Sequence, residues 1–512
     1  MRYICVDPAE YIYPDRFAYA TGSDRICVYT PRDSYACAQI LLSDLNGDET
    51  VTVACEGWSP ELYRMVPVFV ERNESIGDDN RAPHQPEREA PYYVYEALAP
   101  IRGGKLTAEN GVCALYLAWR IEADAEPGIK ECAVTVNGCR IPVTVEVSPV
   151  TVPAETLHMI HGYARQNVAK YHNCEVGSPE FNALDDQYLR MMRRIRQNIL
   201  YCPGPEKVVL DNGEFDVKFD AMEAFMKQTM VLGYQRFIIS IGGRVSWKAS
   251  TIRVYGMDSM SFECYKFLAK MLPALVAFLK ERGWLDRIYM SISDEPNEAN
   301  ATEYRALCGL VRKFAPEIKL LDAMSFGPVH GAVDVWVPIN DEYDRHREEI
   351  EVFRKNGDEI WYYDCCGPRG WGYINRFIDY ALLATRYHFW ANYRYDLKGY
   401  LHWAANYYMP GQDPFKQSCP EHHNADSMCY LPAGDTHIIY PGDGEPWMSI
   451  RLENLRASAE EYELLKLLAE SDRELADEIC LSVFRSFKDV TYDVKLFRNA
   501  RERLLRALEA RK

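Results

Sequence analysis

Residues 286–296 read DRIYMSISDEP, an apolar run that stops at two adjacent acids. The apolar part is rich in β-branched and aromatic side chains, which is typical of a buried strand. Asp294 and Glu295 follow this run directly, and Pro296 restricts the backbone after them. Because like charges repel, such a pair is either a solvated loop at the end of a strand or two groups with a chemical task.

Seven further apolar runs of this kind alternate with longer, helix-like segments. In the segment 262–283, apolar side chains recur at helical spacing until Gly283, which is typical of a helix end. This alternation predicts a (β/α)8 barrel, in which active-site residues lie at the C-terminal ends of the strands. A doubly wound open sheet is the competing architecture, but no glycine-rich nucleotide-binding motif follows any of the runs. The eight runs cover residues 157–164, 198–203, 236–241, 287–293, 318–324, 332–338, 359–365 and 397–405.

The predicted barrel has a different kind of sequence on either side. Residues 1–153 contain alternating β-branched runs and the hairpin signal Asn137-Gly138, so we predict an N-terminal β-sandwich. The barrel is predicted to occupy residues 154–468. Residues 469–512 are predicted to form a C-terminal helical extension that packs against it.

Composition excludes several classes of protein. The chain has 512 residues, of which 48% are hydrophobic, and a net charge of −17. The acidic balance disfavours nucleic acid as a partner, and no apolar run is long enough to span a membrane. The N-terminal residues lack the apolar core of a signal peptide, so we expect a cytoplasmic protein whose 16 cysteines are reduced thiols. The alternative is an exported form from which a leader has been removed. The sequence leaves the oligomeric state open.

The acid pair has a chemical interpretation. Two carboxylates side by side cannot both ionise cheaply, so the pKa of at least one of them rises. One group can then donate a proton near neutral pH while the other stays negatively charged, which is the division of roles that glycoside hydrolysis needs. An aromatic content of 12% fits sugar-binding surfaces, since sugar C–H faces pack on aromatic rings, although it also fits an ordinary core.

Four blocks of the sequence resemble glycoside hydrolase family 123 and a related bacterial family of glycoside hydrolase-like domains of unknown function. The resemblance spans residues 155–468, and the last block is the most specific. A β-sandwich before the barrel also fits this family. The blocks are DRIYMSISDEP at 286–296, EIWYYDCCGP at 359–368, NRFIDYALLATRYHFWANYRYDLKGYLHWAANYY at 375–408 and IIYPGDGEPWMSIRLENLRASAEEYELLKLL at 438–468.

The resemblance implies a retaining exo-glycosidase that removes terminal β-linked N-acetylhexosamine, with N-acetylgalactosamine as the favoured sugar. Catalysis in that family is assisted by the substrate's own acetamido group and needs no cofactor. Glu295 matches the family's general acid/base, and Asp294 matches the carboxylate that orients the acetamide. The partner implied is a glycan or glycoconjugate.

Two alternatives stay open at this point. In one, the enzyme cleaves a non-acetylated sugar and a second carboxylate such as Asp364 is the nucleophile. In the other, the chain binds carbohydrate without turnover. Residues near the predicted strand ends are the candidates for substrate contacts, and they are Trp403, Tyr363, Tyr407, Asn406, Asp364, Trp336, Arg244 and Trp247.

The long loop Met409–Trp447 contains side chains of the types that bind zinc. Cys419, His422, His423 and Cys429 fit no standard zinc spacing. We therefore expect no metal and interpret the loop as a surface segment that caps the site.

Overall fold

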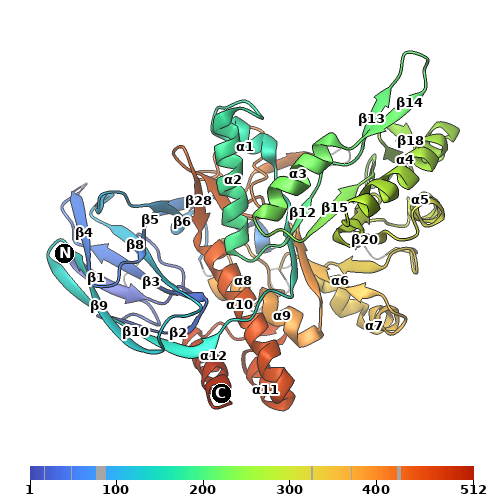
Figure 1. The fold of residues 1–512 in the computed structure, drawn as a ribbon. Helices are drawn as coiled ribbons and strands as arrows, with labels where there is room; N and C mark the ends of the chain where they lie inside the picture. Colours follow the sequence, from blue (N-terminus) through green and yellow to red (C-terminus); the bar gives the residue numbers. More distant parts are fainter. Residues whose placement is uncertain are drawn as a thin grey trace.

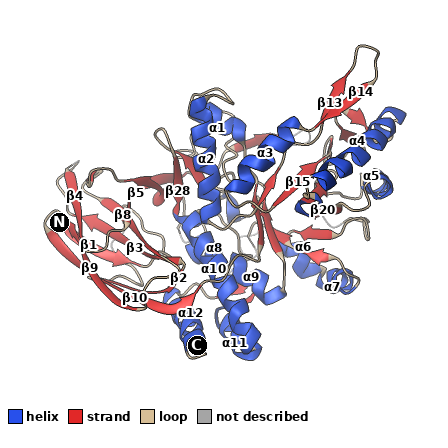
Figure 2. Cartoon of the chain, viewed as in Figure 1, coloured by secondary structure: helices blue, strands red, loops and turns tan. Residues whose placement is uncertain are grey.

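The computed structural model describes the whole chain except residues 16–17, 48, 77–87, 325–326, 371, 424–427 and 512. It is a mixed α/β protein, as the sequence predicts. Strands form most of one side of the molecule, and the other side alternates strands with helices (Figures 1 and 2). Among the described residues, no helix is long and apolar enough to cross a membrane.

Two sheets form the β-rich side of the molecule and share an apolar layer. Ile40 and Leu115 from one sheet, with Val134 and Val143 from the other, belong to this layer and are buried. The predicted hairpin at Asn137-Gly138 is confirmed, since both residues have the positive φ of a type I′ turn. The seven-stranded sheet has the order β1 (Arg2–Val6), β3 (Ser34–Ser43), β8 (Cys113–Ile121), β5 (Glu61–Val70), β6 (Tyr92–Pro100), β28 (Pro446–Ser449), β27 (Ile439–Pro441), and the five-stranded sheet the order β2 (Ile26–Arg32), β10 (Cys139–Thr151), β9 (Gly128–Val136), β4 (Thr50–Glu56), β7 (Lys105–Thr107).

The seven-stranded sheet crosses the predicted boundary at residue 153. Its last two strands, β27 and β28, come from beyond residue 438, and Met448 pairs with Leu98 of β6. The C-terminal helix α12 (Val494–Glu509) also returns to this side, where Arg506 lies 2.7 Å from Glu146 of β10. Both late segments therefore join the N-terminal sheets to the rest of the chain (Figure 1).

All eight predicted runs contain parallel strands, and the run before the acid pair is the fourth. The seventh run is split at Trp361 into two short strands. A parallel bridge between Ile339 and Tyr363 connects the two sheets that these strands form. The six-stranded sheet has the order β12 (Ile199–Tyr201), β15 (Arg236–Ser240), β19 (Ile288–Ser291), β20 (Lys319–Met324), β21 (Val335–Pro338), β22 (Glu359–Ile360), and the three-stranded sheet the order β11 (His158–His161), β24 (Gly399–His402), β23 (Tyr362–Tyr363).

Side-chain amides connect β11 to β12, which belong to different sheets. The backbone N–H of Met159 donates to Asn198 Oδ1 at 3.0 Å, and that of His161 donates to Gln197 Oε1 at 3.1 Å. These contacts satisfy buried backbone groups that would otherwise carry a desolvation cost. The parallel strands thus form a half-barrel and a smaller sheet. Side-chain amides join the two at one edge, and backbone contacts join them at the other, including Lys398 N–H to the Ile360 carbonyl at 2.9 Å.

An apolar core fills the space between the two parallel sheets, and helices cover their outside. The core includes Ile199, Ile238 and Leu321, which are buried and alternate with side chains that face the helices. On α4 (Phe262–Glu281) the apolar stripe predicted at 262–283 is buried. Burial of each such side chain contributes about 1.5–3 kcal/mol to the stability of the fold. The remaining helices are α1 (Arg165–Tyr171), α2 (Pro179–Arg194), α3 (Asp220–Val231), α4 (Phe262–Glu281), α5 (Ala301–Phe314), α6 (Asn340–Arg345), α7 (Arg347–Lys355), α8 (Leu382–Arg386), α9 (His388–Tyr395), α10 (Ile450–Ser471) and α11 (Arg473–Val483).

Short strands and single helical turns lie in the connections between the main helices and strands. The described chain has β13 (Glu206–Val209), β14 (Phe215–Lys218), β16 (Gly242–Arg244), β17 (Ile252–Val254), β18 (Met257–Asp258), β25 (Glu421–His423), β26 (Met428–Tyr430), β29 (Phe484–Ser486), β30 (Asp489–Val490) and the 3-10 turns η1 (Glu74–Ile76) and η2 (Leu285–Arg287).

Candidate active site

The acid pair lies just after the C-terminal end of β19. Asp294 and Glu295 have φ values of 61° and 41°, the left-handed conformation that side chains other than glycine rarely adopt. The backbone N–H of Glu295 donates to the Ala323 carbonyl at 2.9 Å, which holds the turn against β20. Consecutive left-handed residues end the strict alternation of a strand, so both carboxylates emerge at the same rim.

A buried carboxylate below the rim fixes the end of β19. Asp322 is 1% exposed and accepts hydrogen bonds from Ser291 Oγ, from the backbone N–H of Ile292 at 2.9 Å and from Tyr304 Oη at 2.7 Å. Sequence reasoning missed this residue. The available signal was an acid inside the apolar run 318–324, because a buried acid needs several hydrogen bonds.

Glu295 is held from two sides by residues of the predicted site. Tyr363 Oη donates to Glu295 Oε1, and Arg244 Nη2 donates to Glu295 Oε2 at 2.9 Å. Arg244 also donates to the backbone carbonyl of Asp294 at 2.9 Å, and its guanidinium lies 3.8 Å from the centroid of the Trp247 ring. The structure therefore brings Arg244, Trp247 and Tyr363 together with the acid pair.

The pKa of one acid of the pair is raised, as the sequence predicts, and that acid is Asp294. Solvent reaches 62% of the Asp294 side chain, against 16% for Glu295. Surrounding protein nonetheless displaces much of the water near Asp294, and this reduced solvation, together with the negative charge of Glu295, raises the pKa of Asp294 well above its usual range. The Arg244 guanidinium opposes this rise. The resemblance gives the proton-donating role to Glu295, so the acid with the raised pKa is the other member of the pair.

Aromatic side chains follow β24. Trp403 is half-buried, Tyr407 is exposed, and their ring centroids lie 5.3 Å apart. The Trp403 indole nitrogen lies 3.2 Å from Asp435 Oδ2. Asp435 was not predicted, because it lies within the long loop after β24 and no local pattern points to it.

Three candidate residues lie in other surroundings. Asp364 is fully buried and contacts His388 Nε2 at 2.8 Å and Tyr400 Oη at 2.7 Å. Asn406 is also buried, and its side-chain amide exchanges hydrogen bonds with the backbone of Ala164. Trp336 packs against Phe353 at a centroid distance of 4.5 Å.

The register of the strands explains two of these placements. Val335 and Val337 face the core between the sheets, so Trp336 between them faces the helices. Tyr363 likewise faces the core, and Asp364, the next residue, points away from it. The structure therefore does not place these side chains beside the acid pair, and their role as sugar contacts stays a prediction that the geometry does not support.

The zinc-type residues do not form a metal site within the part of the chain that the structure describes. No group of three or more His, Cys, Asp or Glu side chains there could hold an ion. Cys419 is buried and contacts the Arg72 carbonyl, whereas His422 pairs with Cys429 across the β25–β26 hairpin. Residues 424–427 of this predicted loop lie outside the described residues.

Comparisons with known proteins match this chain to a glycoside hydrolase family. The catalytic domain of glycoside hydrolase 123 matches residues 163–468. The structure of a family 123 glycoside hydrolase from Clostridium perfringens is 13% identical, with a TM-score of 0.77, over 100% of this chain and 99% of that one. A family 39 glycoside hydrolase from Bacteroides cellulosilyticus WH2 is 11% identical, over 86% of this chain and 82% of that one, with a TM-score of only 0.37. No curated protein matches the chain.

Proposed function

Because the chain belongs to glycoside hydrolase family 123, we propose that it is a retaining exo-glycosidase acting on terminal β-linked N-acetylhexosamine, with N-acetylgalactosamine as the favoured sugar. In this proposal Glu295 is the general acid and base, and Asp294 orients the acetamido group of the substrate. The carrying observation is the acid pair itself, with Glu295 held by Arg244 and Tyr363 and Asp294 open to solvent.

The proposed reaction has two steps. The acetamido oxygen attacks the anomeric carbon while Glu295 donates a proton to the departing glycosidic oxygen, which gives a cyclic oxazolinium. Water then attacks the same carbon, Glu295 accepts its proton, and the acetamido group is restored. Asp294 accepts a hydrogen bond from the acetamido N–H and stabilises the positive charge of the ring.

Substrate binding would also move the proton within the pair. An N–H donated to Asp294 favours the ionised form of that carboxylate. An ionised Asp294 then disfavours a second negative charge on Glu295, so the shared proton passes to Glu295, where the reaction needs it. The raised pKa of Asp294 in the free protein is compatible with this order of events.

The surroundings of Asp364 favour substrate assistance over a protein nucleophile. A double displacement needs a second carboxylate that can reach the anomeric carbon. Asp364 was the candidate, but it is fully buried and bonded to His388 and Tyr400.

The same proposal includes the architecture. The two parallel sheets would constitute a (β/α)8 barrel that presents the acid pair at the C-terminal ends of its strands, and the two N-terminal sheets a β-sandwich. The Clostridium perfringens relative was analysed for glycolipid glycan hydrolysis, so glycolipid oligosaccharides belong among the substrates to be tried.

Hydrolysis of a matched set of aryl glycosides tests the substrate. We expect turnover of aryl β-N-acetylgalactosaminide and little or none of the corresponding aryl β-galactoside, which lacks the acetamido group. A cyclic thiazoline analogue of the intermediate should inhibit competitively. Cleavage of the galactoside at an equal rate would contradict substrate assistance, and no turnover of any glycoside would contradict the enzymatic function.

Variants of the acid pair test the roles. Glu295→Gln should lower kcat by roughly 10²–10⁴-fold on a poor leaving group and much less on an activated aryl group, because only the former needs a proton. Asp294→Asn should slow both substrates. Glu298→Gln is the matched control, since Glu298 is an exposed acid three residues away. Equal, small effects of both pair variants would contradict the assignment.

A further inference from the structure

Asp435 is a fully buried acid inside the long segment that connects β24 to β27. Its two carboxylate oxygens lie 3.3 and 3.2 Å from the Trp403 indole nitrogen, which donates to them. His402 Nε2 lies 3.4 Å from Asp435 Oδ1. Arg376 donates to the backbone carbonyl of Asp435 at 2.9 Å, so the backbone of this segment is held as well as the side chain.

The backbone of Trp403 is set by its neighbouring strand. The backbone N–H of Gly162 donates to the His402 carbonyl at 2.8 Å, and that of Ala405 donates to the Gly162 carbonyl at 2.6 Å. A Cβ atom at Gly162 would lie 2.0 Å from the Trp403 carbonyl oxygen, so the backbone segments at these two residues are in direct contact. The backbone does not fix the rotation of the half-buried indole ring, whereas the hydrogen bond to Asp435 does.

Cys365 relates this pair to the catalytic acids. A hydrogen bond from Cys365 to Cys366 is the largest cause that raises the pKa of the Cys365 thiol, followed by burial and by the negative charges of Cys366, Glu295 and Asp435. The thiol also packs against the core that contains Tyr363. Tyr363, which donates to Glu295, pairs with Leu401 of β24, and Trp403 follows Leu401 by two residues. Trp403 and the acid pair therefore lie at the same C-terminal ends of the parallel strands.

We propose that Asp435 is a positioning residue, which holds the Trp403 indole as the platform for the apolar face of the bound sugar. The proposal rests on the glycosidase function proposed above and extends the site to the loop after β24. A sugar packed on an aromatic ring depends on the orientation of that ring, so a change at Asp435 acts through Trp403 on substrate binding.

The surroundings of Asp435 make its hydrogen bond to the Trp403 indole depend on pH. Burial raises the pKa of Asp435 to about 7, opposed by the positive charge of Arg376 and by the Trp403 hydrogen bond. Asp364 raises it further and Arg369 lowers it. His402 adds no positive charge, because burial and Arg376 hold its pKa well below the usual range.

The direction of the pH effect follows from these charges. Above pH of about 7 the carboxylate is ionised and accepts a charge-assisted hydrogen bond from the indole, which is stronger than a neutral one. As the pH falls through this value, Asp435 takes up a proton and holds Trp403 less firmly. Substrate binding should therefore weaken on the acidic side.

The test measures kcat and KM separately on an aryl N-acetylhexosaminide between about pH 5.5 and 8.5. We expect the wild-type KM to fall roughly five- to tenfold as the pH rises through the titration of Asp435. In Asp435→Asn the amide oxygen still accepts the indole N–H but does not titrate, so its KM should lose this dependence while kcat changes little. A wild-type KM that does not fall, or an unaltered KM profile in Asp435→Asn, overturns the proposal.

A double-mutant cycle with Trp403→Phe separates positioning from a general structural role. Removing the indole N–H should also flatten the KM profile, and adding Asp435→Asn to it should change KM little further. Fully additive effects overturn the proposal. Trp403→Phe alone tests it if the Asp435 variant does not fold.

Asp379→Asn is the matched control, because Asp379 is another fully buried acid whose pKa burial raises to about 6, bonded to Ser75 and Asn73. Its KM profile should match the wild type, and the same flattening there would overturn the proposal. A wild-type enzyme without turnover contradicts the glycosidase function itself, which distinguishes that failure from the failure of the positioning role.

Discussion

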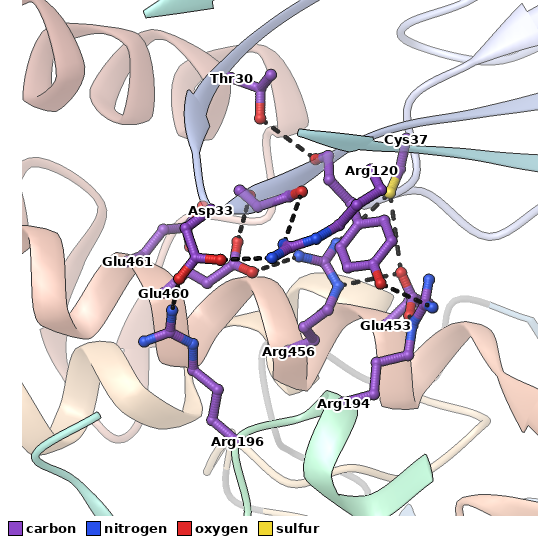
Figure 3. Close-up of polar contacts among 12 residues, drawn as sticks. Thr30, Asp33, Cys37, Arg120, Arg194, Arg196, Glu453, Arg456, Glu460 and Glu461 are labelled. Atoms are coloured by element: carbon purple, nitrogen blue, oxygen red, sulfur yellow. Dashed lines mark hydrogen bonds and ion pairs between the residues drawn. The ribbon is translucent and has the colours of Figure 1, made fainter. Parts of the chain in front are cut away.

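Two groups of acids in this molecule carry similar charges in opposite settings. Asp294 and Glu295 lie at the rim of the parallel strands, on a backbone in the left-handed region. The other group lies on α10, a regular helix whose residues are nearly all buried. There Glu453 and Glu460 face strands of the N-terminal sheets and the end of α2 (Figure 3).

Positive partners make the difference between the two groups. Glu453 lies 2.5 Å from Arg194 and 3.2 Å from Arg456, and Arg456 lies 2.8 Å from Glu460. Burial alone would raise the pKa of Glu453, but the two arginines lower it to about 2. At the rim one arginine, Arg244, serves two carboxylates, and the pKa of Asp294 rises instead.

This contrast separates the structural acids of α10 from the acids proposed to be catalytic. A carboxylate surrounded by guanidinium groups stays ionised and holds elements together, but it has no proton to give. In a pair that shares one guanidinium, the pKa of one carboxyl can rise, as it does for Asp294, which favours the form that holds a proton. The number of nearby cations, more than burial, therefore distinguishes the two roles here.

The largest expected effect comes from disrupting the buried ion pairs of α10. Glu453→Gln leaves Arg194 and Arg456 buried without their shared negative partner, so the free energy of unfolding should fall by about 3–5 kcal/mol. Urea denaturation measures this change. Glu470→Gln, an exposed acid on the same helix, should change it by less than about 0.5 kcal/mol. An equal effect of both variants would contradict the structural role of the α10 ion pairs.

Lowering the pH should remove nearly the same contribution of Glu453 to the unfolding free energy of the wild type. The pKa of Glu453 is about 2 in the folded chain and 4.5 in its ordinary state, so its contribution is complete above pH 4.5 and disappears as the pH falls towards 2. The contribution is about 3 kcal/mol. The difference in unfolding free energy between wild type and Glu453→Gln should therefore shrink over this window. A constant difference would show that the ion pairs do not depend on the charge of Glu453.

The sequence predicted features with local signals and missed those that depend on distant contacts. Apolar runs located the eight parallel strands, and the spacing of the acids located the rim. Trp336, predicted near the site, faces the helices instead, because adjacent residues of a strand point to opposite faces. Asp435 and the pairing of Met448 with Leu98 gave no signal, because each depends on a partner far away in the chain or on burial that only the fold creates.

The division at residue 468 shows the same limit. Helix α10 runs through this position to Ser471, and its helical spacing was visible in the sequence. The burial of its charges gave no such signal, since charged residues are rarely buried unless they are paired. Only the fold brings Arg194 from α2 and Cys37 from β3 against Glu453.

The smallest expected effect concerns the backbone under the two groups. Glu295 has a φ of 41°, so glycine at this position should be more stable than alanine by about 1 kcal/mol. At Glu453, inside the regular helix α10, the order should reverse and alanine should exceed glycine by about 1 kcal/mol. Each comparison removes the same carboxylate in both variants, so the difference in unfolding free energy reports the backbone alone. The same order at both positions would mean that the rim carries no conformational strain, and the left-handed turn would then need no compensation from Arg244 and Tyr363.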